Sequence, residues 1–532
     1  MLHIDTERIR HRLMKDISKF DSFALYGAGN IASLLLKELG EENKPEYCIV
    51  THKDNLAQSI NGIPIVEYKE RKEEIKRRKI LVVIAVSELY EVDIFNFLKN
   101  DGIENVAYAL DYLYNPINNK RVLKKFMRND FAWLESRVMS WEEEHVDIIA
   151  KKNMFERGNE QTGDSIILVV EKFSPRVVKI AKALVKSGKD VMILLNEKVI
   201  HHEWAKFTSA ISGTIEFFIY SSVEELFYYL FQSKGGIIHV FSNTFEPFVS
   251  YILVKFQSHI GKLVYETYDI ANGFYTNIDE ERLEIERYCL QNASGICYRE
   301  FSLEYLENVM HLEIQKKRLR FWDYCSDENF ALLEKEKDEE LSICYVGGVI
   351  TEEEYPDCPF GNFLEVADWC EKNKCHLHIY PSVWDENRYR RYIKKDKTDL
   401  YFHFHKTMQY DKLLTEISKY DYGINPTTDN VWECESSGYN TISKYVYAAT
   451  NKYFDYIDAG LPIIAAIPQK FAQYLEEQGV LINWTNGQYD YDYLLNNKNA
   501  MKEKALELKE NLRISNHIGE LLDFYDTLVI EK

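Results

Sequence analysis

The sequence predicts an α/β protein built from three blocks of parallel sheet covered by helices. In each block, short apolar runs rich in β-branched and aromatic residues alternate with amphipathic stretches of helical length. Glycine-containing or Ser-Pro turns separate these runs from the helices that follow them. The chain has 532 residues, enough for about three domains at roughly 100–200 residues per domain.

The first block starts with "SFALYGAGNIASLLLKELG", which is typical of a strand, a glycine turn and a helix. Further strands are expected at "EYCIVT", "ILVVIAVS" and "ENVAYAL". We therefore assign residues 1–115 to an N-terminal Rossmann-like domain. Turn-forming residues then precede a charged helical stretch, which we assign to a connector at 116–163.

The second and third blocks repeat the pattern. The second opens with "DSIILVVEKFSPRVVKIAKALVKSGKDVMILLNE" and is assigned to residues 164–335. The third opens with "LSICYVGGV" and is assigned to 336–512, and a terminal helix is expected within 513–532. Two successive doubly wound sheets leave a cleft between them, and ligands of such sheets bind at the carboxyl ends of the strands.

Composition and charge limit the function. The fractions of hydrophobic residues, 46%, and charged residues, 28%, are those of a folded globular protein. A net charge of −20 argues against a general nucleic-acid binder, so we expect no nucleic-acid partner. Basic runs at Arg121–Trp133, Lys316–Trp322 and Arg388–Lys395 are either solvated faces or contacts to an anionic membrane surface.

Cysteine usage and apolar runs bear on localisation. The nine cysteines show no CxxC pair and no regular spacing, which favours a reducing compartment. The N-terminal residues lack the apolar core of a signal peptide, and no apolar run approaches about 18 residues. We expect a cytoplasmic protein, with the inner face of the membrane as an alternative location.

The glycine turn of the first block is a candidate nucleotide site. Gly27, Gly29 and Asn30 lie directly after a strand and at the start of a helix, where backbone N–H groups can bind phosphate. The alternative is a glycine turn used only for close helix packing. Where an acidic residue would hold a ribose at the end of the second strand, the chain has Thr51 and His52, which disfavours NAD.

The third block contains a candidate phosphate- and ribose-binding site. Gly347 and Gly348 end its first strand without bulky side chains, so a diphosphate or an acceptor could approach the backbone. In "NKYFDYIDAGLPII", Lys452 and Asp455 lie one helical turn apart. The lysine could neutralise a diphosphate and the carboxylate could accept ribose hydroxyls, whereas the alternative is an ordinary surface ion pair.

The stretch "NKYFDYIDAGLPIIAAIP" resembles the nucleotide-sugar site of the family 4-like glycosyltransferases of GT-B fold. In chain order, "SPRVVKIAKALVKSGKDVMIL" and "GKLVYETYDI" are similar to the opening unit and cleft-facing loop of their acceptor domain, and "SICYVGGV" to the first donor-domain strand. The resemblance covers roughly residues 164–532. It implies that the last two blocks form a GT-B pair and that the terminal helix packs back across the cleft.

The resemblance also implies roles for individual residues. Asp455 takes the place of the glutamate that holds the donor ribose, Lys452 lies near the donor phosphates, and Gly347 and Gly348 form the glycine loop under the diphosphate. Asp269 lies in the cleft-facing loop and is a candidate catalytic residue.

The chain also departs from the family pattern. Tyr447 stands where the family has an earlier glutamate, and Glu435 is the candidate replacement as a catalytic carboxylate. Tyr268 stands where the family often has a histidine. These substitutions motivate the alternative of a glycosyltransferase-like subunit without turnover.

We expect no metal site and no tightly bound cofactor. Lysine and helix N-terminal N–H groups can stabilise a departing diphosphate without an ion, as in GT-B enzymes generally. His403 and His405 alternate on a predicted strand and share a face, but the sequence shows no further ligands, so we interpret them as buried or hydrogen-bonded histidines.

The function expected from these observations is a metal-independent, hexosyltransferase-like glycosyltransferase that moves a sugar from a nucleotide-sugar donor to a glycan, lipid-linked or protein acceptor. The expected setting is bacterial surface polysaccharide biosynthesis. The first block resembles Rossmann-like domains attached to bacterial sugar-modifying enzymes and is the second candidate nucleotide site. Two alternatives stay open: an inactive glycosyltransferase-like binding or assembly subunit, and a nucleotide-dependent sugar oxidoreductase centred on the first glycine turn.

Overall fold

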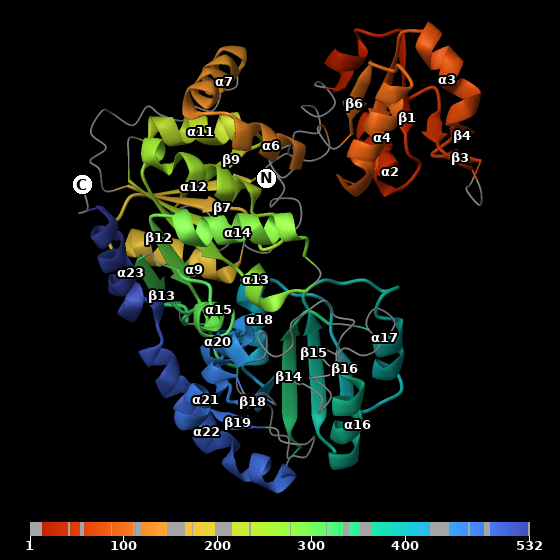
Figure 1. Cartoon of the computed structure of the whole chain (residues 1–532). Helices are drawn as coiled ribbons and strands as arrows, with labels where there is room; N and C mark the ends of the chain where they lie inside the picture. Colours follow the sequence, from red (N-terminus) through yellow and green to blue (C-terminus); the bar gives the residue numbers. More distant parts are fainter. Residues whose placement is uncertain are drawn as a thin grey trace. The chain divides into compact units, whose positions relative to one another are not determined.

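A computed structural model describes most of the chain between residues 13 and 529. The ranges outside the described residues are 1–12, 41–42, 54–57, 87, 110–111, 113–119, 146–164, 173, 197–214, 234–235, 277, 315–316, 329, 334–339, 350, 352–362, 426–445, 466–468, 484–489 and 530–532. The chain divides into two compact units, one made of Met1–His145 with Tyr220–Phe227 and the other of Val146–Ile219 with Tyr228–Lys532. Figure 1 shows their helices and strands.

The first unit contains one sheet in the order β3-β4-β2-β1-β5-β6. All neighbours pair in parallel except β3 and β4, which form an antiparallel hairpin. Its strands are β1 (Ser22–Tyr26), β2 (Cys48–Val50), β3 (Ser59–Ile60), β4 (Ile63–Glu67), β5 (Ile80–Ile84) and β6 (Val106–Tyr108). Its helices are α2 (Asn30–Leu39), α3 (Tyr68–Arg77), α4 (Glu88–Asn100), α6 (Lys120–Arg128) and α7 (Phe131–Glu144).

The second sheet has seven strands in the order β13-β12-β11-β10-β7-β8-β9. The strands are β7 (Ile166–Val170), β8 (Val191–Asn196), β9 (Glu216–Tyr220), β10 (Ile237–Ser242), β11 (Lys262–Thr267), β12 (Gly295–Tyr298) and β13 (Lys317–Arg320). The helices between them are α9 (Pro175–Lys186), α11 (Val223–Gln232), α12 (Phe248–Ile260), α13 (Ala271–Phe274), α14 (Glu280–Asn292) and α15 (Ser302–Asn308). Counted along the chain, the six strands from β7 to β12 have the spatial order 3-2-1-4-5-6 of a Rossmann sheet.

The third sheet has six strands in the order β16-β15-β14-β17-β18-β19, again the Rossmann order. The strands are β14 (Ser342–Gly347), β15 (His376–Pro381), β16 (Phe402–Phe404), β17 (Tyr422–Asn425), β18 (Ile463–Ala465) and β19 (Leu481–Asn483). The helices are α16 (Leu364–Asn373), α17 (Arg390–Asp396), α18 (Tyr410–Ile417), α20 (Asn451–Asp458), α21 (Lys470–Glu477) and α22 (Tyr491–Asn511).

Some helices start where the sequence supplies a cap or a fixed backbone angle. Asp279 and Asp490 accept hydrogen bonds from backbone N–H groups of the first turns of α14 and α22. Pro175 opens α9, where its missing N–H costs nothing because that group has no helical partner. The capping aspartates and the proline are therefore local reasons for where α9, α14 and α22 begin.

The second and third sheets share one apolar core. Residues of α9 and of the last helix, α23 (Ile514–Val529), belong to one buried cluster with residues of α18, α20 and α21. The other face of the third sheet packs against α16, α17 and the start of α22 in a separate cluster. Helix α23 lies against α9 and β13 of the second sheet, whereas α22 lies against α20 of the third.

These topologies confirm the predicted fold class. The chain contains three Rossmann-like blocks, and the last two are doubly wound parallel sheets joined in one unit as a GT-B pair. The predicted domain boundary at 163 lies outside the described residues, and the exact boundaries stay predictions. Among the described helices, none combines the length and the apolar run needed to cross a bilayer.

The glycine turn of the first unit is packed tightly against the sheet. Gly27 follows β1 with a φ of 127°, and a Cβ there would lie 2.3 Å from the carbonyl oxygen of Ala85, just after β5. A Cβ at Gly29 would meet no atom within 4 Å. The first glycine is therefore required for close packing, whereas the second leaves open space.

We predict that Gly27→Ala destabilises the first sheet by about 2–4 kcal/mol, because the methyl group overlaps a backbone oxygen and the φ becomes strained. Hydrogen exchange of the β1 and β5 amides in the full chain should accelerate strongly. The matched variant Gly29→Ala should accelerate exchange much less, since its methyl group meets open space and the change costs only the N-cap preference, about 1 kcal/mol or less. Equal exchange in the two variants would contradict the packing role.

Candidate functional site

The predicted glycine loop and the predicted phosphate lysine meet in the structure. Gly347 ends β14 with a φ of 133°, and a Cβ there would lie 2.6 Å from Cε and 3.3 Å from Nζ of Lys452. A Cβ at Gly348 would meet no atom within 4 Å. The lysine side chain therefore lies over the bare backbone at the carboxyl end of β14, where ligands of parallel sheets bind.

The ammonium group of Lys452 is short of negative charge. Its side chain is half-buried, and burial lowers the pKa of Lys452, while the nearby Asp455 carboxylate opposes that shift. Its Nζ lies 5.4 Å from the centre of the Tyr345 ring. Within the part of the chain that the structure describes, no carboxylate lies within 4.0 Å of this ammonium. An anion bound here would supply the missing countercharge.

The first turn of α20 adds to this positive environment. Lys452 is its second residue, and Thr450 at the N-cap makes no side-chain hydrogen bond to the helix. The amide N–H groups of a first turn carry partial positive charge and favour anions. The corner of Gly347, Gly348, Lys452 and the α20 N-terminus is hereafter called the phosphate corner.

Packing fixes α20 against the sheet. The Tyr456 ring lies over Gly423 of β17, where a Cβ would be 2.3 Å from the ring. The Tyr456 hydroxyl donates to the Ile424 carbonyl at 2.8 Å and accepts from the Val346 N–H at 3.3 Å. Because α20 rests directly on the two central strands, its first turn is held near the end of β14.

Asp455 lies in the same helix, and its half-buried carboxylate accepts a hydrogen bond from a tyrosine. The hydroxyl of Tyr410, the first residue of α18, donates to Asp455 Oδ1 at 2.6 Å. Burial raises the pKa of Asp455, while the nearby Lys179 ammonium and the Tyr410 hydroxyl counteract that shift. The carboxylate predicted to hold the donor ribose is thus already oriented by a tyrosine on a neighbouring helix.

Asp458 faces a different part of the unit. It is fully buried, and both of its carboxylate oxygens lie 3.0 Å from the backbone N–H of Ser326, which donates to them. The Lys509 ammonium donates to its backbone carbonyl at 2.6 Å. This aspartate therefore ties α20 to the segment after β13 and to α22, a structural role.

Asp269 lies in the loop after β11, as predicted. Its Oδ2 accepts from the Tyr275 hydroxyl at 2.8 Å, and its Oδ1 lies 3.2 Å from the Arg299 guanidinium. The Thr244 hydroxyl further contacts the backbone on both sides, accepting from the Asp269 N–H at 3.1 Å and donating to its carbonyl at 2.9 Å. The backbone of the loop is therefore held by hydrogen bonds, and both oxygens of the Asp269 carboxylate already have donors.

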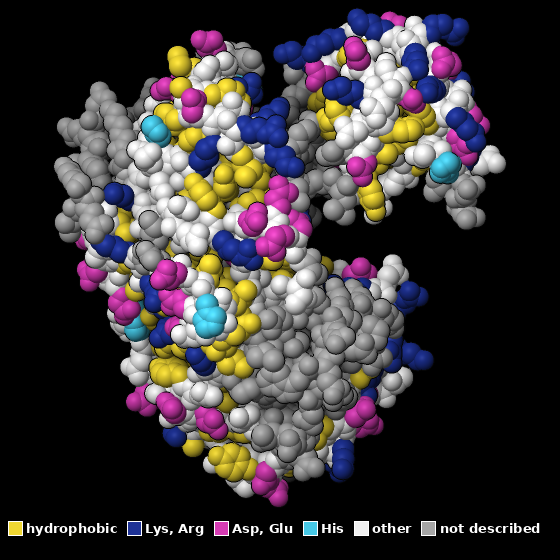
Figure 2. Space-filling view, viewed as in Figure 1, with side chains coloured by type: hydrophobic (Ala, Val, Ile, Leu, Met, Phe, Trp, Pro, Cys, Tyr) yellow, Lys and Arg dark blue, Asp and Glu magenta, His cyan; other side chains and the backbone are white. Residues whose placement is uncertain are grey.

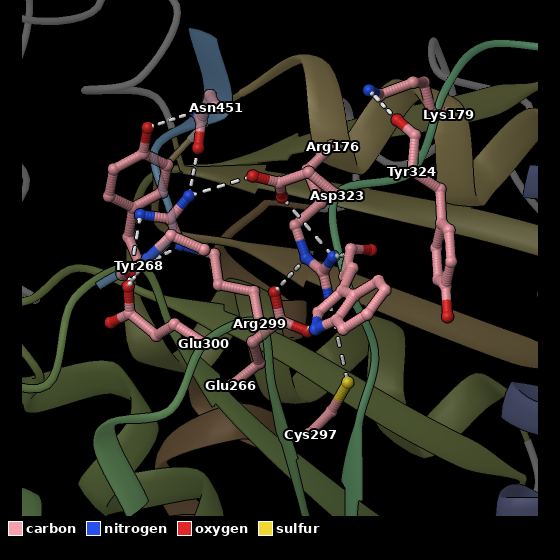
Figure 3. A network of polar contacts seen from close by, with 12 residues as sticks. Arg176, Lys179, Glu266, Tyr268, Cys297, Arg299, Glu300, Asp323, Tyr324 and Asn451 are labelled. Carbon is pink, nitrogen blue, oxygen red and sulfur yellow. Dashed lines mark hydrogen bonds and ion pairs between the residues drawn. The ribbon is translucent and has the colours of Figure 1, made fainter. Parts of the chain in front are cut away.

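Arg299, directly after β12, connects the predicted site residues, and sequence reasoning missed it. Its side chain is 4% exposed and donates to the Tyr268 carbonyl at 2.7 Å, to Asp323 at 3.0 Å, and to the Asn451 side-chain oxygen (Figure 3). Its guanidinium also lies 4.1 Å from the centre of the Tyr268 ring. One buried arginine thus joins the cleft loop to the first residue of α20.

A second buried arginine lies beside it. Arg176 of α9 makes a bidentate pair with Glu266 at 2.7 and 3.1 Å and donates to the Trp322 carbonyl at 2.6 Å (Figure 3). Asp323 lies 3.4 Å from Arg176 and 3.0 Å from Arg299, so it is shared between the two guanidinium groups. Arg299 follows β12 directly and Arg176 lies in the first turn of α9, and the sequence alone does not show that either side chain is buried.

The glycine turn of the first unit has one clear role and one untested role. The packing of Gly27 on Ala85 explains that glycine without a ligand. Gly29 and Asn30 are exposed at the start of α2, and Gly29 as N-cap makes no side-chain hydrogen bond. A nucleotide site at these two residues stays a prediction.

Other predicted groups have different outcomes. Glu435 lies outside the described residues, so its role stays a prediction. Tyr447, which replaces the family glutamate, packs against Tyr305 with ring centres 5.1 Å apart. His403 and His405 are hydrogen-bonded, as interpreted, and their partners are two histidines of β15.

The basic runs are mixed with acidic side chains. On edge strand β13, Arg320 pairs with Glu304 of α15 at 2.9 Å, and Arg318 pairs with Glu307. Figure 2 shows basic and acidic side chains next to one another over the described surface of the face it draws. Helix α17, in the basic run Arg388–Lys395, exposes several of its basic residues. Between β13 and α17, the helix is therefore the better candidate for a membrane contact.

A cavity of about 290 Å³ lies beside α9, near the segment after β13. Among its described lining residues are Tyr410, which bonds Asp455, and Lys179. Gly347 and Lys452 are not among them, so this cavity is distinct from the phosphate corner.

No protein-family model matches the chain, and no curated protein is similar to it in sequence. Solved structures do resemble it. The pneumococcal O-GlcNAc transferase GtfA in complex with UDP and GlcNAc is 8% identical, with a TM-score of 0.49 over 70% of this chain and 100% of that one. AviGT4, a glycosyltransferase of avilamycin A biosynthesis, is 7% identical, with a TM-score of 0.43 over 69% and 99%.

A Listeria monocytogenes protein described as a UDP-N-acetylglucosamine 2-epimerase is 10% identical, with a TM-score of 0.39 over 67% of this chain and 94% of that one. The GT-B fold of two Rossmann-like domains is given by the chain's own sheet topology. At these identities and TM-scores, the similarities carry no information about the function of this chain.

Asp458 generates a testable pH dependence. Burial raises the pKa of Asp458 from 3.8 to about 7, although Lys179 and the Ser326 N–H favour its charged form. The folded state therefore holds this proton more tightly than the unfolded state. The contribution to the free energy of unfolding is full below about pH 4 and is lost as the pH rises through about 7.

We predict that Asp458→Asn removes this dependence. The unfolding free energy of the wild type relative to the variant should fall between about pH 4 and pH 7, by up to about 4 kcal/mol. Urea denaturation of both proteins at several pH values measures the difference, and any constant cost of the amide cancels. A difference that does not change with pH would contradict the assignment.

Proposed function

We propose that this chain is a glycosyltransferase that moves a sugar from a nucleotide-sugar donor to a glycan, lipid-linked or protein acceptor. The observation that supports it is the phosphate corner. Lys452, half-buried and without a carboxylate partner in the described part of the chain, lies against the bare backbone at Gly347. A diphosphate fits the charge and the space at this position.

The reaction needs stabilisation of the leaving group. A glycosidic bond forms between the acceptor oxygen and the anomeric carbon, while the bond from that carbon to the diphosphate breaks and the diphosphate keeps the electron pair. The acceptor hydroxyl proton leaves to a base. Lys452 and the first-turn N–H groups of α20 would stabilise the charge that develops on the diphosphate. The chain's own cationic groups can thus supply the stabilisation that a metal-independent enzyme requires.

Other residues receive roles consistent with their geometry. Asp455, oriented by Tyr410, would accept ribose hydroxyls with its remaining oxygen lone pairs. Asp269, held by Arg299 and Tyr275, would line the acceptor side of the cleft. Glu435 is the proposed second carboxylate, the candidate to receive the acceptor proton.

We place this activity in the bacterial cytoplasm, in surface polysaccharide synthesis at the inner face of the membrane. The basic residues that α17 exposes support a membrane contact. The first unit, with its open position at Gly29, is a second candidate nucleotide site.

A second candidate is a glycosyltransferase-like binding subunit without turnover. It is favoured by the carboxylate of Asp269, whose two oxygens already contact Tyr275 and Arg299 and are less available as a base. Tyr447 in place of the family glutamate points the same way. Both candidates bind a donor at the phosphate corner and differ only in turnover.

We predict that one nucleotide binds and stabilises the chain. The candidates are the diphosphates UDP, GDP and dTDP, and CMP, which represents donors that carry a single phosphate. At 100 times its dissociation constant, the ligand should add about 2.7 kcal/mol to the free energy of unfolding. Lys452→Met should weaken a nucleoside diphosphate by about 10-fold to 100-fold, because it removes a charged hydrogen bond. Affinity for the nucleoside without phosphate should not change. Isothermal titration measures both.

The matched control is Lys504→Met, which removes an exposed lysine of α22 and should leave both affinities unchanged. Diphosphate affinity that is equal in Lys452→Met and wild type would contradict the phosphate corner. Hydrolysis or transfer of the donor sugar by the wild type separates an enzyme from a binding subunit.

A further inference from the structure

Four histidines gather on one face of the third sheet, at its edge. His376 and His378 belong to β15, and His403 and His405 lie in or directly after the edge strand β16. The parallel register places His378 opposite His403. Since alternate residues of a strand share a face, all four imidazoles lie on the face opposite Phe402 and Phe404.

The imidazoles contact one another through ring nitrogens. His376 Nδ1 lies 2.9 Å from His403 Nε2, and His378 Nδ1 lies 3.0 Å from His405 Nε2. A hydrogen bond between two ring nitrogens requires one of them to be an unprotonated acceptor. Each pair therefore holds a nitrogen lone pair, which is the group that binds a transition metal.

The tautomer of His376 can be assigned from its other nitrogen. Its Nε2 lies 3.1 Å from Glu340 Oε2, and an ionised carboxylate only accepts hydrogen bonds. Nε2 therefore carries the proton, Nδ1 is the acceptor, and His403 Nε2 donates to it. A carboxylate that holds the outer nitrogen of a histidine is the usual outer support of a metal ligand.

We propose that His376, His378 and His403 form a binding site for a late first-row divalent metal, with Zn²⁺ as the expected ion. One nitrogen from each lies within 4.8 Å of the others, with His376 and His403 at 2.9 Å. Ligands of a tetrahedral zinc ion with bonds of about 2.0–2.1 Å lie about 3.4 Å apart, inside this range. Imidazole nitrogen is a preferred ligand of Zn²⁺, Cu²⁺ and Ni²⁺.

Binding requires a change of tautomer at His403. The proton on His403 Nε2 moves through solvent to its Nδ1, so the imidazole stays neutral and the Nε2 lone pair turns to the metal. No net proton is released. Water fills the fourth position of the ion, as at other three-histidine sites.

The second group of candidate ligands does not support a metal site. His239, Glu266 and Cys297 also lie close together and are buried. Arg176, however, donates to both oxygens of Glu266 and lies 3.7 Å from Cys297 Sγ. A guanidinium already supplies the cation there.

The histidine site is independent of the proposed donor site. His376 pairs with Ser342 at the start of β14, whereas Gly347 at the other end forms the phosphate corner. The five intervening steps correspond to about 16 Å. A metal at this position would join the edge strand β16 to β15 and stabilise the sheet edge, and it would not take part in sugar transfer.

The test uses the full chain without an affinity tag, freed of metal by a chelator and then titrated with Co²⁺. The wild type should bind one Co²⁺ with the visible d–d bands of a tetrahedral site, and Zn²⁺ should displace it and raise the unfolding temperature. His376→Gln and His403→Gln should lose the bands. The control His259→Gln removes an exposed histidine of α12 and should keep them.

Glu340→Gln keeps all three ligands. It separates loss of metal binding from loss of folding, which the histidine variants alone cannot do. It should weaken Co²⁺ by about 10-fold to 100-fold while leaving the metal-free unfolding temperature unchanged. Absence of the d–d bands in the wild type would overturn the proposal. Bands of equal intensity in the wild type, His376→Gln and His403→Gln would overturn it as well.

Discussion

The geometry of the cleft depends on the buried Arg299 guanidinium. A buried cation is stable only when carboxylates and other acceptors surround it, and removing one partner of such a pair costs about 3–5 kcal/mol. Arg299 meets this requirement with Asp269, Asp323 and the Asn451 side chain, which come from three separate segments. The need to neutralise one charge thus fixes the cleft loop, the segment after β13 and the first turn of α20 relative to one another.

This constraint places Lys452 where it can act. Asn451 bonds Arg299 from one side, and Tyr456 rests on Gly423 from the other, so α20 is held at both ends. Burial lowers the pKa of Lys452, and repulsion from the nearby Arg299 guanidinium lowers it further. The Lys452 ammonium and the N-terminus of α20 together favour an anion, and a diphosphate has this character.

The fold could be predicted from the sequence because its signals are local. Continuous apolar runs such as those of β5 and β7 indicate strands buried on both faces, and capped or proline-started helices follow them. The meeting of Gly347 and Lys452 was reached only through the family resemblance, because no local pattern joins residues so far apart. For the first glycine turn, packing on Ala85 explains Gly27, whereas a nucleotide site at Gly29 stays a prediction.

What the sequence could not predict depends on register and on side-chain partners. The pairing of β15 with β16 brings His376 and His378 next to His403 and His405. The sequence showed no such neighbours, because the register between two strands cannot be read from one sequence. The Tyr410 partner of Asp455 comes from another helix. Arg299 was missed because a charged residue after a strand reads as a loop residue until its buried acceptors are known.

The measurement that tests the central claim most directly is a crystal structure of the full chain with its tightest-binding nucleotide. The account predicts that the phosphates lie within hydrogen-bond distance of the Lys452 ammonium and of the backbone at Gly348, with the ribose at Asp455. Phosphates bound only at Gly29 and Asn30 of the first unit, or with the Lys452 ammonium turned away from them, would contradict it.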